Sequence, residues 1–258
     1  MKAYVLKNGT LIGPRKGIID DCPDDPSITI ETPIYCVLFE HPDGYILFDA
    51  ACHDDAARQS PFILKALLMK EEEKLLNRLA EINVKPEQIK YLILSHMHAD
   101  HSGYIEKFPN AEIYVSDREF RNTVKDYALG VSRSGPDVEY WISCKLNWKL
   151  IPDEQKTLEL AEGITILNLG SGHSYGMLGL LAQLPKTGKI LIVGDAIYTS
   201  ENLGPPVKLP GIIQDPVGYQ ATVDYVTDLA KKENAQIWFG HDIEQYKNFI
   251  ASGDGCYE

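Results

Sequence analysis

The stretch SHMHADHSG concentrates metal-binding side chains more densely than any other part of this chain. Three of the chain's seven histidines stand there within six residues, and an aspartate lies among them: His96, His98, Asp100 and His101. This spacing differs from the i, i+4 pair that a helix presents on one face, and it can supply two adjacent ions. Imidazole nitrogens mixed with carboxylate oxygens suit zinc, iron, manganese or cobalt.

Further ligand-type residues stand after three other apolar runs. His173 follows ITILNLG in GSGHS, Asp195 ends KILIVGD, and His241 follows QIWFG. Strands whose ends meet at one edge bring such residues into one pocket, so we expect these three to complete the site. A lone histidine is more often a solvated loop residue, but a cluster is not typical of that role. His41 and His53 lack this setting, and we expect both at the surface.

The elements that must carry these residues are predicted from periodicity and turn signals. The run IYCVLFEHPDGYILFDA predicts a hairpin that turns at Pro42-Asp43-Gly44 and whose second strand ends at Asp49. Apolar residues at helical spacing predict helices over 71–82 and around 219–230, and we expect a third over 117–128. Other strands are expected in KYLILS, AEIYVS, GITILNLG, GMLGLLAQL, KILIVGD and AQIWFGHD. Such a mixture of strands and helices, with several hairpins, favours two packed sheets flanked by helices.

The composition is that of a globular protein with an acidic balance. The 258 residues suit one domain over 1–258, because no Gly/Ser-rich or Pro-rich linker divides them. The net charge of −12 argues against a nucleic-acid partner, which requires a basic face. No run has the apolar length of a signal peptide or a membrane span. Five scattered cysteines fit a reducing compartment, so we expect a cytoplasmic protein without a membrane partner.

The motif HMHADH resembles the HxHxDH signature of the metallo-β-lactamase superfamily, and the later histidines and aspartate follow in the expected order. Two stretches are similar to the quorum-quenching N-acyl homoserine lactonases: WFGHDIEQ, and DAIYTSEN with Tyr198 three residues after Asp195. The resemblance implies an α+β fold, namely an αββα sandwich of two packed mixed β-sheets flanked by helices.

The same resemblance implies two divalent first-row metal ions, zinc in the first place and iron, cobalt or manganese as alternatives. The ligands of one ion would be three histidines: His96, His98 and His173. The ligands of the other would be an aspartate and two histidines, with a second aspartate bridging both ions: Asp100, His101, His241 and Asp195. Asp49 would accept a hydrogen bond from a ligand imidazole and so fix its orientation.

The implied reaction is the opening of a neutral lactone that carries an acyl chain. A hydroxide shared by the two ions would attack the ester carbonyl, whose oxygen would receive a hydrogen bond from Tyr198. Asp100 would carry a proton to the leaving oxygen. The residues expected to line the acyl-chain pocket are Phe62, Ile63, Leu67, Met69 and Ala99. A core or dimer-contact helix is the alternative interpretation of SPFILKALLM. The proline-rich loop 201–218 is expected to form a stiffened lid beside Asp195.

Two other functions stay open. One is a different ester or thioester hydrolase on the same fold, although the 17 residues after His241 leave no room for a glyoxalase II-type extension. The other is a non-catalytic metal-binding scaffold, which would show a broken ligand set, whereas all seven ligand positions and Tyr198 are present. The segment 117–150, with Trp141 and Trp148, is expected to shape either the acyl pocket or the interface of a homodimer.

Overall fold

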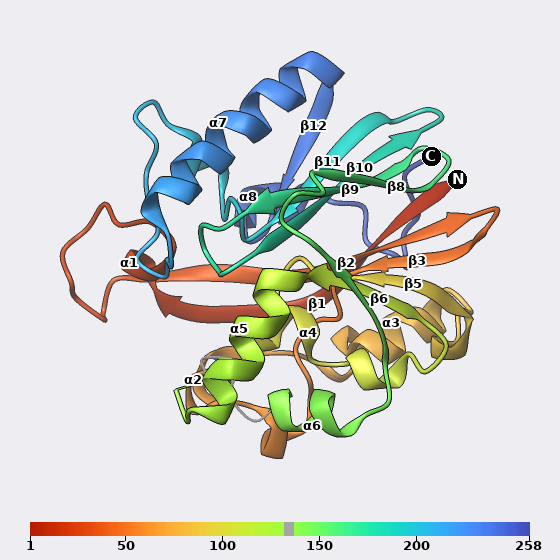
Figure 1. The fold of residues 1–258 in the computed structure, drawn as a ribbon, viewed down its shortest axis with the longest axis horizontal. Helices are drawn as coiled ribbons and strands as arrows, with labels where there is room; N and C mark the ends of the chain where they lie inside the picture. Colours follow the sequence, from red (N-terminus) through yellow and green to blue (C-terminus); the bar gives the residue numbers. More distant parts are fainter. Residues whose placement is uncertain (132–136) are drawn as a thin grey trace.

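The computed structural model describes residues 1–131 and 137–258, which form two stacked β-sheets with helices outside them (Figure 1). The strands are β1 Lys2–Pro14, β2 Thr29–His41, β3 Gly44–Phe48, β4 Leu67–Leu68, β5 Ile89–Ile93, β6 Glu112–Ser116, β7 Asn147–Ile151, β8 Thr157–Ala161, β9 Ile164–Gly170, β10 Met177–Leu184, β11 Gly188–Gly194 and β12 Ala235–Phe239. The helices are α1 Arg15–Ile18, α2 Pro61–Ala66, α3 Leu75–Glu81, α4 Ala99–Ser102, α5 Asp117–Ala128, α6 Asp137–Ser143, α7 Pro216–Glu233 and α8 Ile243–Asn248. None of the described helices is long and apolar enough to cross a bilayer.

Both sheets are mixed. The seven-stranded sheet has the order β4-β1-β2-β3-β5-β6-β7, and the five-stranded sheet has the order β12-β11-β10-β9-β8. In the first sheet β1, β2 and β3 are antiparallel, whereas β3, β5, β6 and β7 run parallel. In the second sheet only the β11–β12 pair is parallel. The expected αββα sandwich of the α+β class is confirmed.

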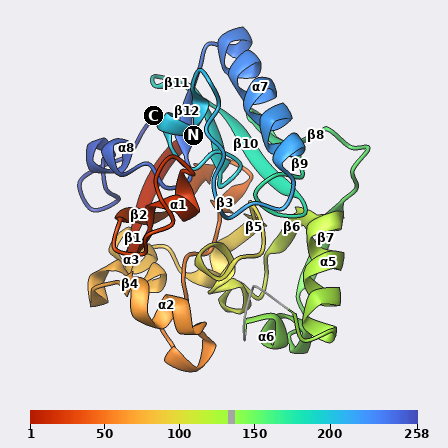
Figure 2. The same ribbon diagram turned by 90° about the vertical axis from the view of Figure 1, so that its left-hand side faces the viewer.

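Apolar side chains fill the space between the sheets. Val37, Phe39 and Ile46 of one sheet pack in the same buried cluster as Leu180 and Trp238 of the other. Helices α3 and α5 lie outside the seven-stranded sheet and α7 lies outside the five-stranded sheet, as Figures 1 and 2 both show. Each fully buried side chain of this size contributes about 1.5–3 kcal/mol to folding, so the sandwich is a rigid base for the residues at its edge.

The predicted elements are largely present. The hairpin is β2–β3, helix α5 covers the expected residues, and α7 contains the expected apolar stripe. The helix expected over 71–82 is confirmed for Leu75–Glu81, but its first turn is wrong, because Lys74 adopts ψ 138 and separates a short turn of 3-10 helix from α3. Strands β1, β7 and β8 were not predicted, since β1 is broken by the polar run KNGT and the other two lie in polar sequence.

The carboxyl ends of five strands meet at one edge of the sandwich. Strands β3 and β5 are parallel neighbours in one sheet, and β11 and β12 are parallel neighbours in the other. Strand β9 is antiparallel to β10, which is antiparallel to β11, so β9 ends at the same edge. The segments that follow these strands carry every residue predicted to ligate a metal ion.

Candidate metal centre

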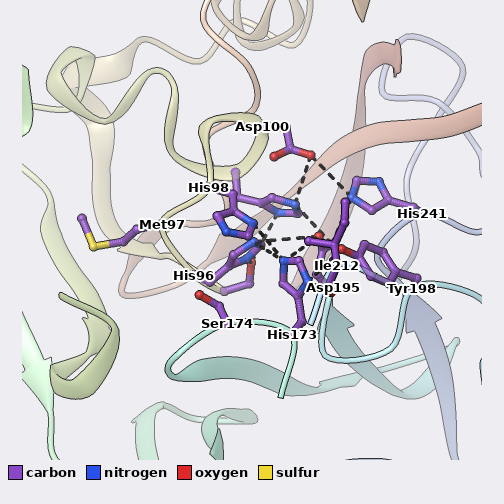
Figure 3. A network of polar contacts seen from close by, with 12 residues as sticks. His96, Met97, His98, Asp100, His173, Ser174, Asp195, Tyr198, Ile212 and His241 are labelled. Carbon is purple, nitrogen blue, oxygen red and sulfur yellow. Dashed lines mark hydrogen bonds and ion pairs between the residues drawn. The ribbon is translucent and has the colours of Figure 1, made fainter. Parts of the chain in front are cut away.

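Three histidines turn their ring nitrogens toward one another, and we name them the three-histidine group: His96, His98 and His173. Nε2 of His173 lies 3.1 Å from Nε2 of His96 and 2.9 Å from Nδ1 of His98 (Figure 3). Burial lowers the pKa of all three imidazoles, that of His173 to about 3. They are therefore neutral at physiological pH, and neutral imidazoles are the form that binds metal ions.

A second set, the carboxylate group, lies beside it and consists of Asp100, His101, Asp195 and His241. Oδ1 of Asp195 lies 3.2 Å from Nε2 of His101 and 3.0 Å from Nε2 of His241. Oδ2 of Asp100 lies 3.6 Å and 3.5 Å from the same two nitrogens. Burial lowers the pKa of His101 and of His241, but Asp195 and Asp100 outweigh it and raise both values. The two groups thus differ in charge as well as in composition.

Asp195 stands between the two groups. Its Oδ1 faces the carboxylate group, while its Oδ2 lies 3.5 Å from Nε2 of His173 and 3.8 Å from Nε2 of His96. Burial raises the pKa of this carboxyl, but His101 and His241 overcome that effect and hold it well below its usual value. The residue before His241 must be a glycine, because a Cβ on Gly240 would come within 2.6 Å of Asp195 Oδ1.

Hydrogen bonds behind the imidazoles fix their orientation. Nδ1 of His241 lies 2.8 Å from the carbonyl oxygen of Pro33, and Nδ1 of His173 lies 3.0 Å from that of Ile212. A carbonyl oxygen can only accept, so both Nδ1 atoms carry a proton, and in the neutral ring that binds a metal ion Nε2 then presents its lone pair to the site. The bond to Ile212 also brings the predicted lid, residues 201–218, to the site.

Asp49 supports His101 in the same way. Its Oδ2 lies 2.8 Å from Nδ1 of His101, and its two oxygens accept hydrogen bonds from the backbone N–H and the hydroxyl of Ser95. Asp49 follows β3 with φ 62, in the left-handed region, which aspartate tolerates better than most residues. This turn aims the carboxylate across the sheet edge toward the segment after β5.

The arrangement fits divalent metal ions. Within each group the candidate ligand atoms all lie within 4.8 Å of one another. Among the described residues, Nε2 of His101 and Oδ1 of Asp195 are buried and make no hydrogen bond of good geometry, although they lie 3.2 Å apart as an ion pair. An unsatisfied buried polar atom costs about 1–3 kcal/mol, and coordination would remove that cost. The mixture of imidazole and carboxylate suits first-row ions, so the chemistry of the donors and their geometry agree.

A cavity of about 400 Å³ opens above these groups. Tyr198 lines it, and its hydroxyl oxygen lies 2.8 Å from Nδ1 of His173. Burial, together with Asp195 and Asp100, raises the pKa of this phenol well above its usual value, so the hydroxyl keeps its proton. The apolar wall of the cavity is formed by Leu11, Ile18, Phe62, Ile63, Ala99 and Ile212.

Some of the residues expected to form a pocket lie elsewhere. Phe62, Ile63 and Ala99 line the cavity, but Leu67 and Met69 do not. Helix α2 ends at Ala66, and Leu67 then pairs with Leu11 in the short edge strand β4. Leu11, Ile18 and Ile212 were missed, because they come from distant segments without a distinctive motif.

The long segment 117–150 does not reach this cavity with the residues that the structure describes there. Trp148 packs against Phe120 with ring centroids 4.9 Å apart, and Trp141 is buried near both. Residues 132–136 of the segment lie outside the described residues.

The expectation that His53 lies at the surface is wrong. Its exposure is 7%, and its ring stacks on Tyr104 with centroids 4.7 Å apart. Nε2 of His53 lies 3.4 Å from a carboxylate oxygen of Glu106, which also binds Arg58. Arg58 also donates to the carbonyl oxygen of Gly103, two residues after His101. His53 is not among the grouped metal-ligand residues, so it belongs to a buried ionic cluster beside the candidate metal centre.

Comparison with known proteins gives consistent results. Residues 29–231 match the family model of the metallo-beta-lactamase superfamily. The chain is 33% identical over 270 residues to the N-acyl homoserine lactonase AiiB of Agrobacterium fabrum, an alignment that covers 99% of this chain and 94% of that protein.

Two solved structures extend the comparison. The crystal structure of a quorum-quenching N-acyl homoserine lactone lactonase superposes with a TM-score of 0.83 at 27% identity, over 100% of this chain and 98% of that one. An N-acyl homoserine lactone hydrolase with the product N-hexanoyl-L-homoserine at its catalytic metal centre superposes with a TM-score of 0.81 at 28% identity, covering 97% and 96% of the chains.

Proposed function

This chain belongs to the N-acyl homoserine lactonases of the metallo-β-lactamase superfamily, and we propose that it hydrolyses the lactone ring of N-acyl homoserine lactones. The observation that carries this proposal is the position of Asp195, with one carboxylate oxygen toward each ligand group beneath an apolar cavity. A relative with a hydrolysed lactone at its metal centre supports the same assignment.

Two divalent ions, with zinc as the proposed metal, would be held by the three-histidine group and by the carboxylate group, with Asp195 between them. When bound, such ions supply Lewis acidity, which polarises an ester carbonyl and lowers the pKa of water. Asp49 holds His101, and the backbone carbonyls of Pro33 and Ile212 hold His241 and His173.

Tyr198 donates a hydrogen bond to the ester carbonyl oxygen as that oxygen gains charge. Nδ1 of His173 donates toward both the Ile212 carbonyl and the Tyr198 oxygen, so the phenol's own proton stays available to the substrate. A donor placed in advance at a developing oxyanion stabilises the transition state more than the ground state.

Asp100 lines the cavity and is placed to move the proton that the reaction requires. Hydrolysis adds water across the ester C–O bond: the carbonyl carbon gains a hydroxyl group, and the ring oxygen leaves as an alkoxide that must be protonated. We assign to Asp100 the transfer of a proton from the attacking water to this leaving oxygen, since its carboxylate is partly exposed to the cavity. The carboxylic acid product ionises at neutral pH and releases one proton.

The cavity selects a neutral and amphipathic substrate. Its wall is formed mainly by apolar side chains, and Phe62 and Ile212 are 49% and 41% exposed at its rim. Its volume of about 400 Å³ lies within the range of small-molecule sites. An acyl chain along this wall would leave the lactone ring above Asp195 and Tyr198.

The proposal is tested by identifying the product. The zinc-loaded protein is incubated with N-hexanoyl homoserine lactone, and mass spectrometry is expected to show a product heavier by one water. Removal of the metal with a chelator should abolish this product, and zinc should restore it. Release of the free fatty acid instead of the ring-opened acid would show cleavage of the amide bond and contradict the proposal.

A further inference from the structure

Glu119 is a buried carboxylate on α5 that binds both segments of the three-histidine group. Its exposure is 0%, and its Oε1 accepts a hydrogen bond from the backbone N–H of Met97 at 3.0 Å. Its Oε2 accepts from the hydroxyl of Ser174 at 2.7 Å and from the backbone N–H of Gly176 at 3.1 Å. Three donors from two distant segments therefore converge on one side chain.

These donors are adjacent to the ligands. Met97 lies between His96 and His98 in the chain, and Ser174 follows His173; Figure 3 shows Met97 and Ser174 beside these rings and away from His241. The segment after His173 also lies close to the start of α5, because a Cβ on Gly176 would come within 2.1 Å of the Ser116 hydroxyl oxygen. The position of α5 therefore sets the distance between the two histidine segments.

We propose that Glu119 is a positioning residue that assembles the three-histidine group before an ion arrives. It does not line the cavity, and it holds the ligand segments through two backbone N–H groups and the hydroxyl of Ser174. This inference rests on the metal site of the proposed function but not on the identity of the substrate.

The site requires a carboxylate rather than an amide. In a Glu119→Gln variant only one of the two terminal atoms is an acceptor. If the amide oxygen faces Ser174 and Gly176, the amide nitrogen faces the backbone N–H of Met97. In the reverse orientation the amide nitrogen faces the backbone N–H of Gly176. Either way a buried backbone N–H loses its acceptor, so the attachment of one histidine segment is weakened.

The test is a zinc affinity measured by chelator competition, without any substrate. For Glu119→Gln we expect one of the two zinc ions to bind about 10–100-fold more weakly, as is usual when a supporting residue of a ligand is changed, while the other ion is retained. The matched control is Asp126→Asn on the same helix, where one hydroxyl, that of Tyr175, donates to the carboxylate and an amide oxygen can replace it. The control should bind both ions with wild-type affinity.

Equal zinc affinities in Glu119→Gln and the wild type would overturn the inference, as would an equal loss in the control. A second measurement needs no variant: in wild-type protein stripped of metal, the amide hydrogens of Met97 and Gly176 should already be protected from exchange. Free exchange until zinc is added would also overturn it. A protein that binds two zinc ions but opens no lactone would contradict the proposed function and leave this inference standing.

Discussion

The hydroxyl oxygen of Tyr198 lies 2.8 Å from Nδ1 of His173, while Nε2 of the same ring lies 2.9 Å from Nδ1 of His98. One imidazole therefore connects the phenol to the three-histidine group. Because Nδ1 also faces the carbonyl oxygen of Ile212, it must be the donor to both oxygens. Tyr198 contacts only the Nδ1 side of this ring, and Nε2 faces the other histidines. Loss of the phenol hydroxyl should therefore affect catalysis without removing a metal ligand.

Tyr198→Phe is expected to keep both metal ions and to lose about 10²–10³-fold in kcat, the usual cost of removing one oxyanion donor. The ring still fills the buried position, and His173 keeps its bond to the Ile212 carbonyl. Metal content by elemental analysis and steady-state lactone hydrolysis provide the check. An unchanged rate, or loss of metal along with the rate, would remove Tyr198 from the proposed mechanism.

Asp49→Asn should weaken zinc binding about 10–100-fold, because the single amide oxygen cannot accept from both the backbone N–H of Ser95 and Nδ1 of His101, which bond different oxygens of the carboxylate. The control is Asp215→Asn, which makes the same chemical change at the N-cap of α7, where asparagine is equally suitable. Chelator competition on both variants is the measurement. Wild-type zinc affinity in Asp49→Asn would show that this aspartate does not support His101.

Phe62→Ala should reduce kcat/KM for lactones with long acyl chains by about tenfold, since it removes apolar wall that a chain would cover. Short-chain substrates and metal content should be little affected. Leu64→Ala is the matched control, because Leu64 lies on the same helix, is 50% exposed and does not line the cavity. Equal effects of the two substitutions on long chains would place the acyl chain elsewhere.

Acid stability should depend on Glu106. Burial raises the pKa of this carboxyl, but His53 and Arg58 outweigh it and lower the value from 4.5 to about 2. A depressed pKa stabilises the folded state above the unfolded pKa, and this contribution is lost as pH falls from about 4.5 toward 2. Glu106→Gln should therefore lower the free energy of unfolding by about 3 kcal/mol at pH 7 and by much less near pH 2.

Urea unfolding of Glu106→Gln and the wild type across this pH range measures the difference. A gap between the two proteins that stays constant with pH would mean that the charge of Glu106 does not contribute. The side chain is 13% exposed, so solvent screening is modest at this position.

The seven candidate ligands could be predicted from the sequence because each follows an apolar strand, and strand ends share an edge of the sandwich. Asp49 also follows an apolar strand, but its role beside a ligand imidazole was predicted only from the resemblance to the family. Glu119 was not, since its partners at Met97 and Gly176 are backbone N–H groups, which leave no pattern in the residue types. A buried glutamate on an amphipathic helix looks like any other polar residue until the fold is known.

The pocket residues were the least predictable part of the site. Leu67 and Met69 follow Phe62 in one apolar run, but α2 ends at Ala66 and the chain turns into an edge strand. Leu11 and Ile212 reach the cavity from segments about 200 residues apart in the chain. A wall assembled by tertiary packing carries no local periodicity, so sequence alone could not identify it.

The most direct test of the central claim is acid release in a pH-stat, with zinc-loaded protein and N-acyl homoserine lactones of several chain lengths. The account predicts one proton per lactone opened, a rate that depends on the acyl chain, and loss of turnover in Asp195→Asn. A thioester substrate serves as the comparison for the rival hydrolase. No acid release from any lactone, or turnover that survives in Asp195→Asn, would contradict it.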